Sequence, residues 1–155
     1  MSSMPKDCIL IVKHHPFIRE KMGIPKEYEN RVFDLSEGAS INELLFLTDL
    51  LITDYSSSIF EAALLRIPMV FYVFDKEAYL EERDIYGDFD QFIPGKQAKT
   101  QEELGWIVRE SLEGERNTTD LEQFLEFYLS ALDGKSTRRV VEKISSLLGT
   151  KNAGD

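Results

Sequence analysis

The sequence predicts an α/β protein: a Rossmann-like parallel sheet with helices on both faces and a helical carboxyl-terminal end. Two observations carry this prediction. Short apolar runs of strand length alternate with helical segments over the first half of the chain, which is the order of parallel strands joined by right-handed crossovers. The second half has the 3.6-residue periodicity of amphipathic helices. A length of 155 residues suits one domain with a core of its own.

Four strands are expected in the first half, and each is an apolar run that ends at polar or turn-forming residues. They cover residues 8–12, 32–35, 49–53 and 69–73. The first connection is a turn or short helix that runs to about residue 22. A helix over residues 40–46 begins at a capping box, Ser40 with Glu43. The helix over residues 57–66 ends before Pro68.

Three amphipathic helices are expected after residue 99. The first begins at a second capping box, Thr100 with Glu103. The apolar positions of the three helices, in order, are Leu104, Ile107, Val108 and Leu112; Leu121, Phe124, Leu125, Tyr128 and Leu129; and Val140, Val141, Ile144, Leu147 and Leu148. The domain is expected to span residues 8–148, between a disordered start at 1–7 and a frayed tail at 149–155.

The composition narrows the functional classes. A formal net charge of −10 argues against a general surface for nucleic acid or anionic membrane, so no nucleic-acid partner is expected. The start of the chain differs, because cations dominate there. The cationic side chains are Lys6, Lys13, His14, His15, Arg19 and Lys21, against Asp7 and Glu20. This basic corner can bind a small anionic ligand.

The sequence lacks several other signals. No apolar run approaches the roughly 18 residues that cross a bilayer, and the polar start does not resemble a signal peptide. The single Cys8 lies in an apolar run, which is typical of a buried, reduced thiol in a cytoplasmic protein. No spacing of Cys and His suggests a metal site. Neither a metal nor another cofactor is therefore expected.

The serine turn, residues 54–58, is the most informative part of the chain. The apolar run at 50–52 predicts a buried strand, and Ser56, Ser57 and Ser58 follow where a helix begins. A helix start has unpaired N–H groups, and serines add further donors, so the turn is a candidate phosphate site. N-capping is the alternative, although three serines exceed what one cap needs. Asp54 is expected to orient the turn.

The first strand is expected to end near the same place. Ligands of parallel sheets bind outside the carboxyl ends of the strands, and Lys13, His14 and His15 follow the first strand as the serines follow the third. The two adjacent histidines point to opposite sides of an extended segment. His15 is the better candidate, because Pro16 fixes its backbone as extended. It can donate to a phosphate or transfer a proton; a structural role is the alternative.

Further candidates lie on the helix after the serines and on a later loop. Glu61 follows the serines by one helical turn and can accept hydrogen bonds from ribose hydroxyls, or it is an ordinary exposed carboxylate. The loop at Pro94 and Gly95 either lets the backbone approach a ligand or is a plain turn.

Arg83 follows the fourth strand, near Tyr79 and Tyr86, at a further loop of the rim. Its guanidinium can bind a phosphate through two parallel hydrogen bonds. The alternative is a surface ion pair with Glu81 or Glu82. Both readings remain open on the sequence.

Seven segments match, in order, the motifs of one family. They are His15-Pro16 and residues 51–57 (LITDYSS), 68–72 (PMVFY), 79–86 (YLEERDIY), 92–95 (FIPG), 99–104 (KTQEEL) and 133–136 (DGKS). Over about residues 8–148 the chain resembles the carboxyl-terminal half of the CDP-glycerol:poly(glycerophosphate) glycerophosphotransferases. These bacterial enzymes prime or polymerise wall teichoic acid.

The resemblance implies one half of a two-domain GT-B fold, with this chain as the half that binds the nucleotide donor. The family transfers glycerol phosphate, or ribitol phosphate in close relatives, from a CDP-alditol to a lipid-linked acceptor, and CMP leaves. Carried over, His15, Ser56 and Ser57 hold the diphosphate, with Arg83 and the 94–95 loop nearby. The resemblance also implies a cytoplasmic enzyme, peripheral at the inner face of the membrane, that binds its acceptor through an amino-terminal domain.

Two features depart from the family pattern. The family commonly has an aspartate-containing stretch after the serines, where this chain has residues 59–62 (IFEA). A glutamate there is similar to the wider sugar-nucleotide enzymes of this fold, in which it contacts ribose. The histidine of the family's amino-terminal domain has no counterpart here. The resemblance therefore assigns His15 to phosphate stabilisation and the base to the other domain, and the chain alone is expected to be inactive.

Three alternatives remain. The nearest alternative is the donor half of a UDP-sugar-dependent glycosyltransferase or epimerase, which nucleotide preference would distinguish. A receiver-like signalling domain would use Asp54 as phospho-acceptor, but receivers need acidic residues after the first strand, where this chain has residues 13–15 (KHH). A non-catalytic module that binds a partner is the third.

Overall fold

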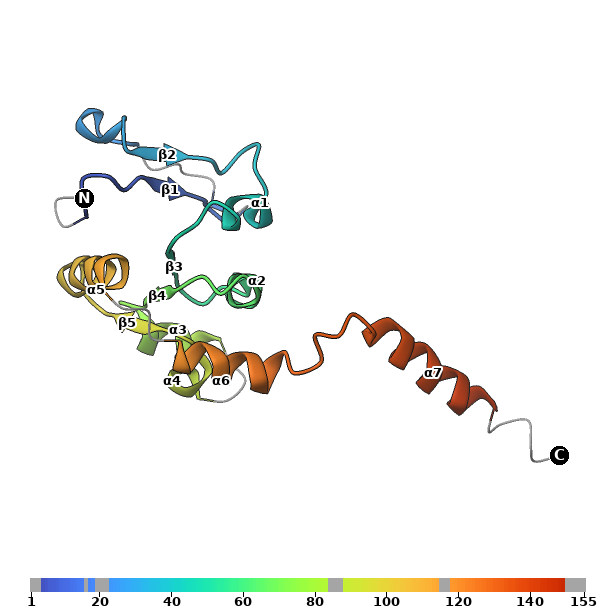
Figure 1. The fold of residues 1–155 in the computed structure, drawn as a ribbon. Helices are drawn as coiled ribbons and strands as arrows, with labels where there is room; N and C mark the ends of the chain where they lie inside the picture. Colours follow the sequence, from blue (N-terminus) through green and yellow to red (C-terminus); the bar gives the residue numbers. More distant parts are fainter. Residues whose placement is uncertain (1–3, 16, 19–22, 84–87, 115–117, 150–155) are drawn as a thin grey trace.

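The computed structural model describes residues 4–15, 17–18, 23–83, 88–114 and 118–149 of the chain (Figure 1). Its strands pair in parallel, which confirms the predicted fold class. The amino-terminal pair is β1 (Leu10–Val12) and β2 (Val32–Asp34), in the register that sets Leu10 opposite Val32. A short 3-10 helix, η1 (Lys26–Tyr28), precedes β2.

A second sheet, in the order β3-β4-β5, lies at the centre of the molecule (Figure 1). β3 spans Leu51–Thr53, β4 spans Met69–Tyr72 and β5 spans Lys96–Ala98. β4 is the central strand, and only its last residue, Tyr72, is not fully buried. Three consecutive residues of β4, Met69, Val70 and Phe71, are therefore part of the core.

The expectation of one continuous sheet of at least four strands is wrong. Within the described residues, β1 pairs only with β2, and β3 pairs only with β4. β1, β2 and β3 have three residues each, and β1 and β3 are only half-buried. Ladders this short supply few hydrogen bonds, so helix and loop packing decides how the two sheets are joined. The carboxyl ends of β1 and β3 consequently belong to different sheets.

The described residues contain seven α-helices. They are α1 (Ile41–Leu45), α2 (Ser58–Leu64), α3 (Lys76–Glu82), α4 (Phe89–Phe92), α5 (Gln101–Glu113), α6 (Thr119–Tyr128) and α7 (Ser136–Gly149). Both predicted capping boxes are confirmed: Ser40 and Thr100 accept from the backbone N–H of Glu43 and Glu103, at 3.2 Å in each case. The three closing helices are present as predicted.

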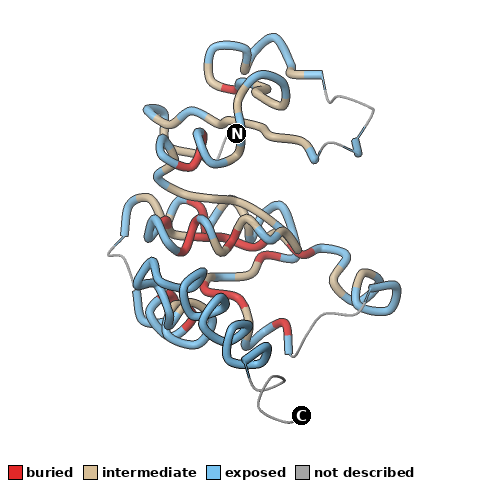
Figure 2. The backbone as a smooth tube through the Cα atoms, turned by 90° about the vertical axis from the view of Figure 1, so that its right-hand side faces the viewer, coloured by how far each residue is buried: buried red, intermediate tan, exposed pale blue. Residues whose placement is uncertain are grey.

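Helices cover both faces of the β3-β4-β5 sheet, as predicted. Successive side chains of β4 point to opposite faces, so each face has apolar residues on which helices pack. Met69 and Phe71 face the larger core, where α2, α4 and α6 contribute residues. Val70 faces the other side and clusters with Ile107 of α5. Figure 2 shows the buried residues gathered around this sheet.

The closing helix α7 has no buried residue, although its sequence is amphipathic. The five side chains of its apolar face are between 51% and 64% exposed; they are Val140, Val141, Ile144, Leu147 and Leu148. In Figure 1 the helix extends away from the sheets, beyond a turn at Gly134, whose φ is +70°. The predicted helix is confirmed, but nothing in the described part of the chain covers its apolar face.

The edge strand β5 is joined to α5 by a cation–π contact. The ammonium of Lys96 lies 5.8 Å from the ring centre of Trp106, the single tryptophan of the chain. Trp106 itself is 64% exposed. The tryptophan ring therefore lies at the protein surface, on the side of the central sheet that α5 covers.

Other expectations have mixed outcomes. Cys8 is free, but it precedes β1 and is half-buried rather than buried; burial, then the charge of Asp7, raises the pKa of its thiol. No helix of the described ranges is long and apolar enough to cross a membrane. Those ranges also hold no cluster of His, Cys, Asp and Glu suited to a metal. The turn up to residue 22 with Pro16, the segments 1–7 and 149–155, and Tyr86 lie wholly or partly outside the described residues.

Candidate functional site

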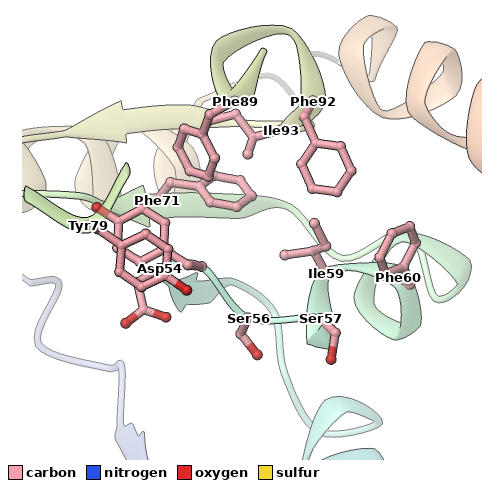
Figure 3. Close-up of a pocket in the computed structure, with 11 residues that line it drawn as sticks. Asp54, Ser56, Ser57, Ile59, Phe60, Phe71, Tyr79, Phe89, Phe92 and Ile93 are labelled. Atoms are coloured by element: carbon pink, nitrogen blue, oxygen red, sulfur yellow. The ribbon is translucent and has the colours of Figure 1, made fainter. Parts of the chain in front are cut away.

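The turn between β3 and α2 borders a cavity of about 300 Å³. Four consecutive residues of the turn line one side of it: Asp54, Tyr55, Ser56 and Ser57. The rest of the wall is almost entirely aromatic or aliphatic; it comprises Ile59, Phe60, Phe71, Tyr79, Phe89, Phe92 and Ile93 (Figure 3). The cavity thus has a polar edge and an apolar floor, which is the usual make-up of a small-molecule site.

The hydroxyls of the serine turn have different roles. Ser56 Oγ accepts from the backbone N–H of Ser58 at 3.2 Å and lies 2.9 Å from Ser58 Oγ. Ser57 is the N-cap residue of α2, yet its side chain makes no capping hydrogen bond. In Figure 3 the hydroxyls of Ser56 and Ser57 point to the same side, away from the ring of Phe89.

The N-capping alternative therefore applies to Ser56, whose Oγ accepts a backbone N–H of the first turn, while the exposed Ser57 makes no capping hydrogen bond. α2 has only seven residues, from Ser58 to Leu64, so its dipole is weaker than that of a long helix. Any anion at this turn would depend mainly on the hydroxyls and on nearby cations.

A pair of tyrosines stands beside the serines. The rings of Tyr55 and Tyr79 are stacked, with 3.6 Å between centroids and 12° between planes. The Tyr55 hydroxyl donates to Asp75 Oδ1 at 3.1 Å. Burial, this hydrogen bond and the charge of Asp75 raise the pKa of Tyr55 above its ordinary value. Tyr55 consequently remains a neutral phenol whose proton is already engaged.

Arg83 ends α3 and is exposed. Its guanidinium carbon lies 5.9 Å from the ring centre of Tyr79, a cation–π contact. The alternative ion pair with Glu81 or Glu82 is not formed, and no other carboxylate of the described residues pairs with Arg83. Arg83 does not itself line the cavity, but the ring under it does.

Beneath the cavity an aromatic cluster joins α2, α4 and α6. Phe60 lies 5.4 Å from Phe124 and 6.0 Å from Phe92, and Phe92 lies 4.9 Å from Tyr128, all between ring centroids. Edge-to-face and tilted pairs of this kind add specific geometry to the burial of apolar area. The floor of the cavity is therefore continuous with the hydrophobic core.

The end of β1 is organised around Lys13. Its ammonium donates to three carbonyl oxygens of the loop after β2, those of Leu35 at 3.5 Å, Ser36 at 2.8 Å and Ala39 at 2.6 Å. The backbone N–H of His14 donates to Ser36 Oγ at 2.9 Å. The predicted basic corner is thus partly structural, because one of its cations ties two loops together.

His15 is exposed and does not line the cavity at the serine turn. The backbone N–H of Phe17 donates to its Nδ1 at 3.3 Å, and the two rings lie 4.9 Å apart. Because Nδ1 accepts, this contact assigns the proton of the neutral imidazole to Nε2. His14 lines a separate, mainly apolar hollow of about 260 Å³ beside β1 and β2.

The remaining predicted residues lie outside the cavity. Glu61 is exposed on α2, and its carboxylate forms no ion pair with the described residues. Pro94 is buried and leads into β5. A Cβ on Gly95 would lie 2.3 Å from the carbonyl oxygen of Met69, so glycine is required there by the approach of β5 to β4.

Sequence reasoning missed Tyr55 and the aromatic floor. Tyr55 lies inside the motif that identified the turn, so its place in the turn could be predicted, but its contact with another ring could not. Tyr79, noted only as a neighbour of Arg83, has its ring on Tyr55 although 24 positions separate them along the chain. The contact follows from the pairing of β3 with β4, which brings the start of α3 beside the serine turn.

Comparisons with known proteins give a consistent result. The model of the family described as CDP-Glycerol:Poly(glycerophosphate) glycerophosphotransferase matches residues 2–146. The chain is 43% identical over 136 residues to a teichoic acid poly(ribitol-phosphate) polymerase of Bacillus spizizenii. It is 40% identical over 143 residues to a teichoic acid ribitol-phosphate primase of the same organism.

These alignments cover most of this chain but a minor part of the relatives. They include 88% of the chain and 22% of the polymerase, and 92% of the chain and 36% of the primase. The solved structure of the wall teichoic acid polymerase TagF superposes with a TM-score of 0.68 at 22% identity, over 97% of this chain and 37% of TagF. At that identity the likeness shows the fold. Because the family model matches nearly the whole length of this chain, the chain belongs to the CDP-glycerol:poly(glycerophosphate) glycerophosphotransferase family.

Proposed function

We propose that this chain is the donor-binding part of a CDP-alditol phosphotransferase of teichoic-acid-type polymer synthesis. The full-length enzyme would transfer alditol phosphate from the CDP-alditol to a lipid-linked acceptor and release CMP. The observation that supports this best is the cavity at residues 54–57, which joins serine hydroxyls to an aromatic floor in a chain of this family. One TagF structure that superposes with the chain was solved after a soak with CDPG.

The donor diphosphate would lie against the exposed hydroxyl of Ser57, with Ser56 and Ser58 shaping the turn. Arg83 supplies the nearby positive charge. Glu61, on the helix that follows the serine turn, would accept hydrogen bonds from the ribose hydroxyls. Pro94 and Gly95 would act indirectly, by setting the backbone next to Ile93 of the cavity wall.

In the transfer step the acceptor hydroxyl attacks the β-phosphorus, the bond from that phosphorus to the bridging oxygen breaks, and CMP takes the electron pair. The hydroxyl proton passes to a base, which we place in the part of the enzyme outside this chain. His15 donates from Nε2 to a phosphate oxygen, because its Nδ1 already accepts from Phe17. Since His15 does not line the cavity in this chain, donor or partner binding must bring the two together.

The alditol that the relatives favour is ribitol. Two relatives named for ribitol phosphate are 43% and 40% identical to the chain, and two more, both of Staphylococcus aureus, are 36% and 35% identical. A teichoic acid poly(glycerol phosphate) polymerase of Bacillus spizizenii is 36% identical, and a glycerol-phosphate primase of Bacillus subtilis is 30% identical. With a lipid-linked acceptor, the full-length enzyme would work as a peripheral protein at the cytoplasmic face of the membrane.

Thermal denaturation with added nucleotides tests the donor. CDP-ribitol, CDP-glycerol or CMP at a hundredfold excess over Kd should raise the Tm by about 5 to 10 °C, by mass action on the folded state. UDP-glucose should raise it less. Equal or greater stabilisation by UDP-glucose would assign the chain to the sugar-nucleotide enzymes instead.

Substitutions at the two histidines test the site. His15→Ala should weaken binding of CDP-ribitol by roughly tenfold or more, since a hydrogen bond to a charged group contributes about 1.5–3 kcal/mol. The paired change Ser56→Ala with Ser57→Ala should have an effect of similar size. His14→Ala is the matched control, because His14 lines the other hollow. Calorimetry that finds His14 the more sensitive would reverse this assignment.

A further inference from the structure

We propose that Tyr79 is a positioning residue, which holds the guanidinium of Arg83 at the mouth of the cavity for contact with a phosphate group. This inference rests on the proposed function in one respect, the presence of a phosphate-bearing ligand at the serine turn. It does not depend on which nucleotide or alditol that ligand carries.

The ring of Tyr79 is held in place from below. It stacks on Tyr55 at 3.6 Å and 12°, and the Tyr55 hydroxyl donates to Asp75 Oδ1 at 3.1 Å. Tyr55 also lies 5.4 Å from the buried Phe89, between ring centroids, in a tilted pair that connects the stacked tyrosines to the core. An aromatic ring with these contacts cannot rotate freely, and it offers a fixed platform at the cavity wall.

Arg83 lies one helical turn after Tyr79. Its backbone N–H donates to the carbonyl oxygen of Tyr79 at 2.9 Å, and its guanidinium carbon lies 5.9 Å from the centre of the Tyr79 ring. Arg83 is the C-cap residue of α3 and its backbone is extended, with φ of -134° and ψ of 124°, so the helix geometry alone does not fix where its side chain lies. The cation–π attraction then selects the orientation of a long side chain with many rotamers.

The charge of Arg83 stays available to a ligand. Within the described ranges no carboxylate pairs with it, although Glu81 and Glu82 directly precede it. A ring orients a cation without neutralising its charge. Tyr79 lines the same cavity as Ser56 and Ser57, and Arg83 contacts its ring, so Arg83 is connected to the cavity through one residue of its wall.

The expected size of the effect follows from the interaction. An exposed cation–π contact corresponds to about a two- to fivefold change in an equilibrium constant. Tyr79→Leu should therefore weaken CMP binding by about two- to fivefold. Tyr79→Phe should restore it, because the ring remains. Cytidine, which has no phosphate, should bind equally to all of these variants.

A double-mutant cycle measured by calorimetry tests the coupling. The four proteins are the wild type, Tyr79→Leu, Arg83→Gln and the double variant, each titrated with CMP, UDP-glucose and cytidine. Tyr79→Leu should have no further effect once Arg83 is replaced. An equal loss with and without Arg83, or an equal loss for cytidine, would overturn the proposal.

Failure of the proposed function gives a different pattern. If the wild type binds UDP-glucose but not CMP, the cytidine donor is wrong, while the coupling of Tyr79 to Arg83 remains measurable with UDP-glucose. If neither phosphate-bearing ligand binds, both proposals fall.

An NMR measurement on the wild type tests the contact between Tyr79 and Arg83 even if a substituted variant does not fold. In the wild type the Nε–H resonance of Arg83 should be shifted upfield by the ring and should move when CMP is added; an unshifted resonance would also overturn the proposal.

Discussion

Helices α6 and α7 have the same kind of amphipathic sequence and opposite environments. Leu121 and Phe124 of α6 are 6% and 5% exposed, whereas Ile144 and Leu148 of α7 are 51% and 64% exposed. The periodicity in each case satisfies the helical template. The difference arises from partners: α6 meets the aromatic residues of α2 and α4, and α7 meets none within the described residues. An apolar stripe therefore predicts that a helix forms, and leaves open what covers it.

The largest expected effect comes from removing a ring that α6 buries. Phe124→Ala should lower the free energy of unfolding by about 3–5 kcal/mol, because Phe124 packs against Phe60 and Phe92 and leaves a cavity. Leu148→Ala on α7 is the matched control and should change it by less than about 0.5 kcal/mol. Urea denaturation measures both. Similar losses for the two variants would show that α7 is covered in solution and would end the contrast.

A second test concerns the close approach of β5 to β4. Gly95→Ala should destabilise the chain by about 1–3 kcal/mol, because the new methyl group meets backbone that cannot move without breaking the ladder. Gly23→Ala is the control, since nothing lies within 4 Å of the corresponding position. If the Gly95 variant is as stable as the wild type, β5 is a looser edge strand than this structure indicates.

The caps of α5 and α6 give a third comparison. Thr100→Ala should cost about 1 kcal/mol, because its hydroxyl accepts the N–H of Glu103 in a complete capping box. Thr118→Ala, at the corresponding position of α6, should cost much less, since Thr118 makes no side-chain capping bond. Thermal unfolding of the two variants should separate them. A larger loss at Thr118 would mean that α6 depends on its start rather than on its buried face.

The smallest effect is a difference in acid stability. Lys76, and then Gln97, hold the pKa of Asp90 below its ordinary 3.8, and Arg139 does the same for Asp133 beside α7. A lowered folded-state pKa gives stability that is present above the ordinary pKa and is lost as the pH falls through the folded value. Asp90→Asn should therefore reduce the fall in urea midpoint between about pH 5 and about pH 3.

The matched variant is Asp133→Asn, which should leave that fall unchanged, because α7 contributes nothing to the packed core. The effect at Asp90 should be a few tenths of a kcal/mol, as for other exposed pairs. A stronger pH response at Asp133 would again place α7 within the cooperative unit.

Much of the fold could be predicted because local signals agree with the structure. The capping boxes at Ser40 and Thr100 and the apolar run of β4 are examples. β5 could not be predicted, since its three residues include only one that is buried, Ala98. The division into two sheets could not be predicted either, because the sequence of a strand does not say which other strand it pairs with.

The site shows the same division. The serine turn was predictable because three hydroxyls in a row depart from what a cap requires. The stack of Tyr55 on Tyr79 was not, because it depends on how α3 returns to the turn. His15 was expected at the same rim, and this expectation failed with the single sheet, since β1 and β3 do not share an edge. Its role in phosphate stabilisation stays a prediction.

Trp106 gives the chain a built-in reporter. As the only tryptophan, it dominates emission when the chain is excited at the red edge of the absorption band, and it stands on α5 beside β5. Its intensity should respond to loss of the nearby Lys96 ammonium when the central sheet opens. A helix as remote as α7 could melt without any change in that signal. Comparing fluorescence with far-ultraviolet circular dichroism, which counts every helix, would therefore resolve two unfolding steps within one chain.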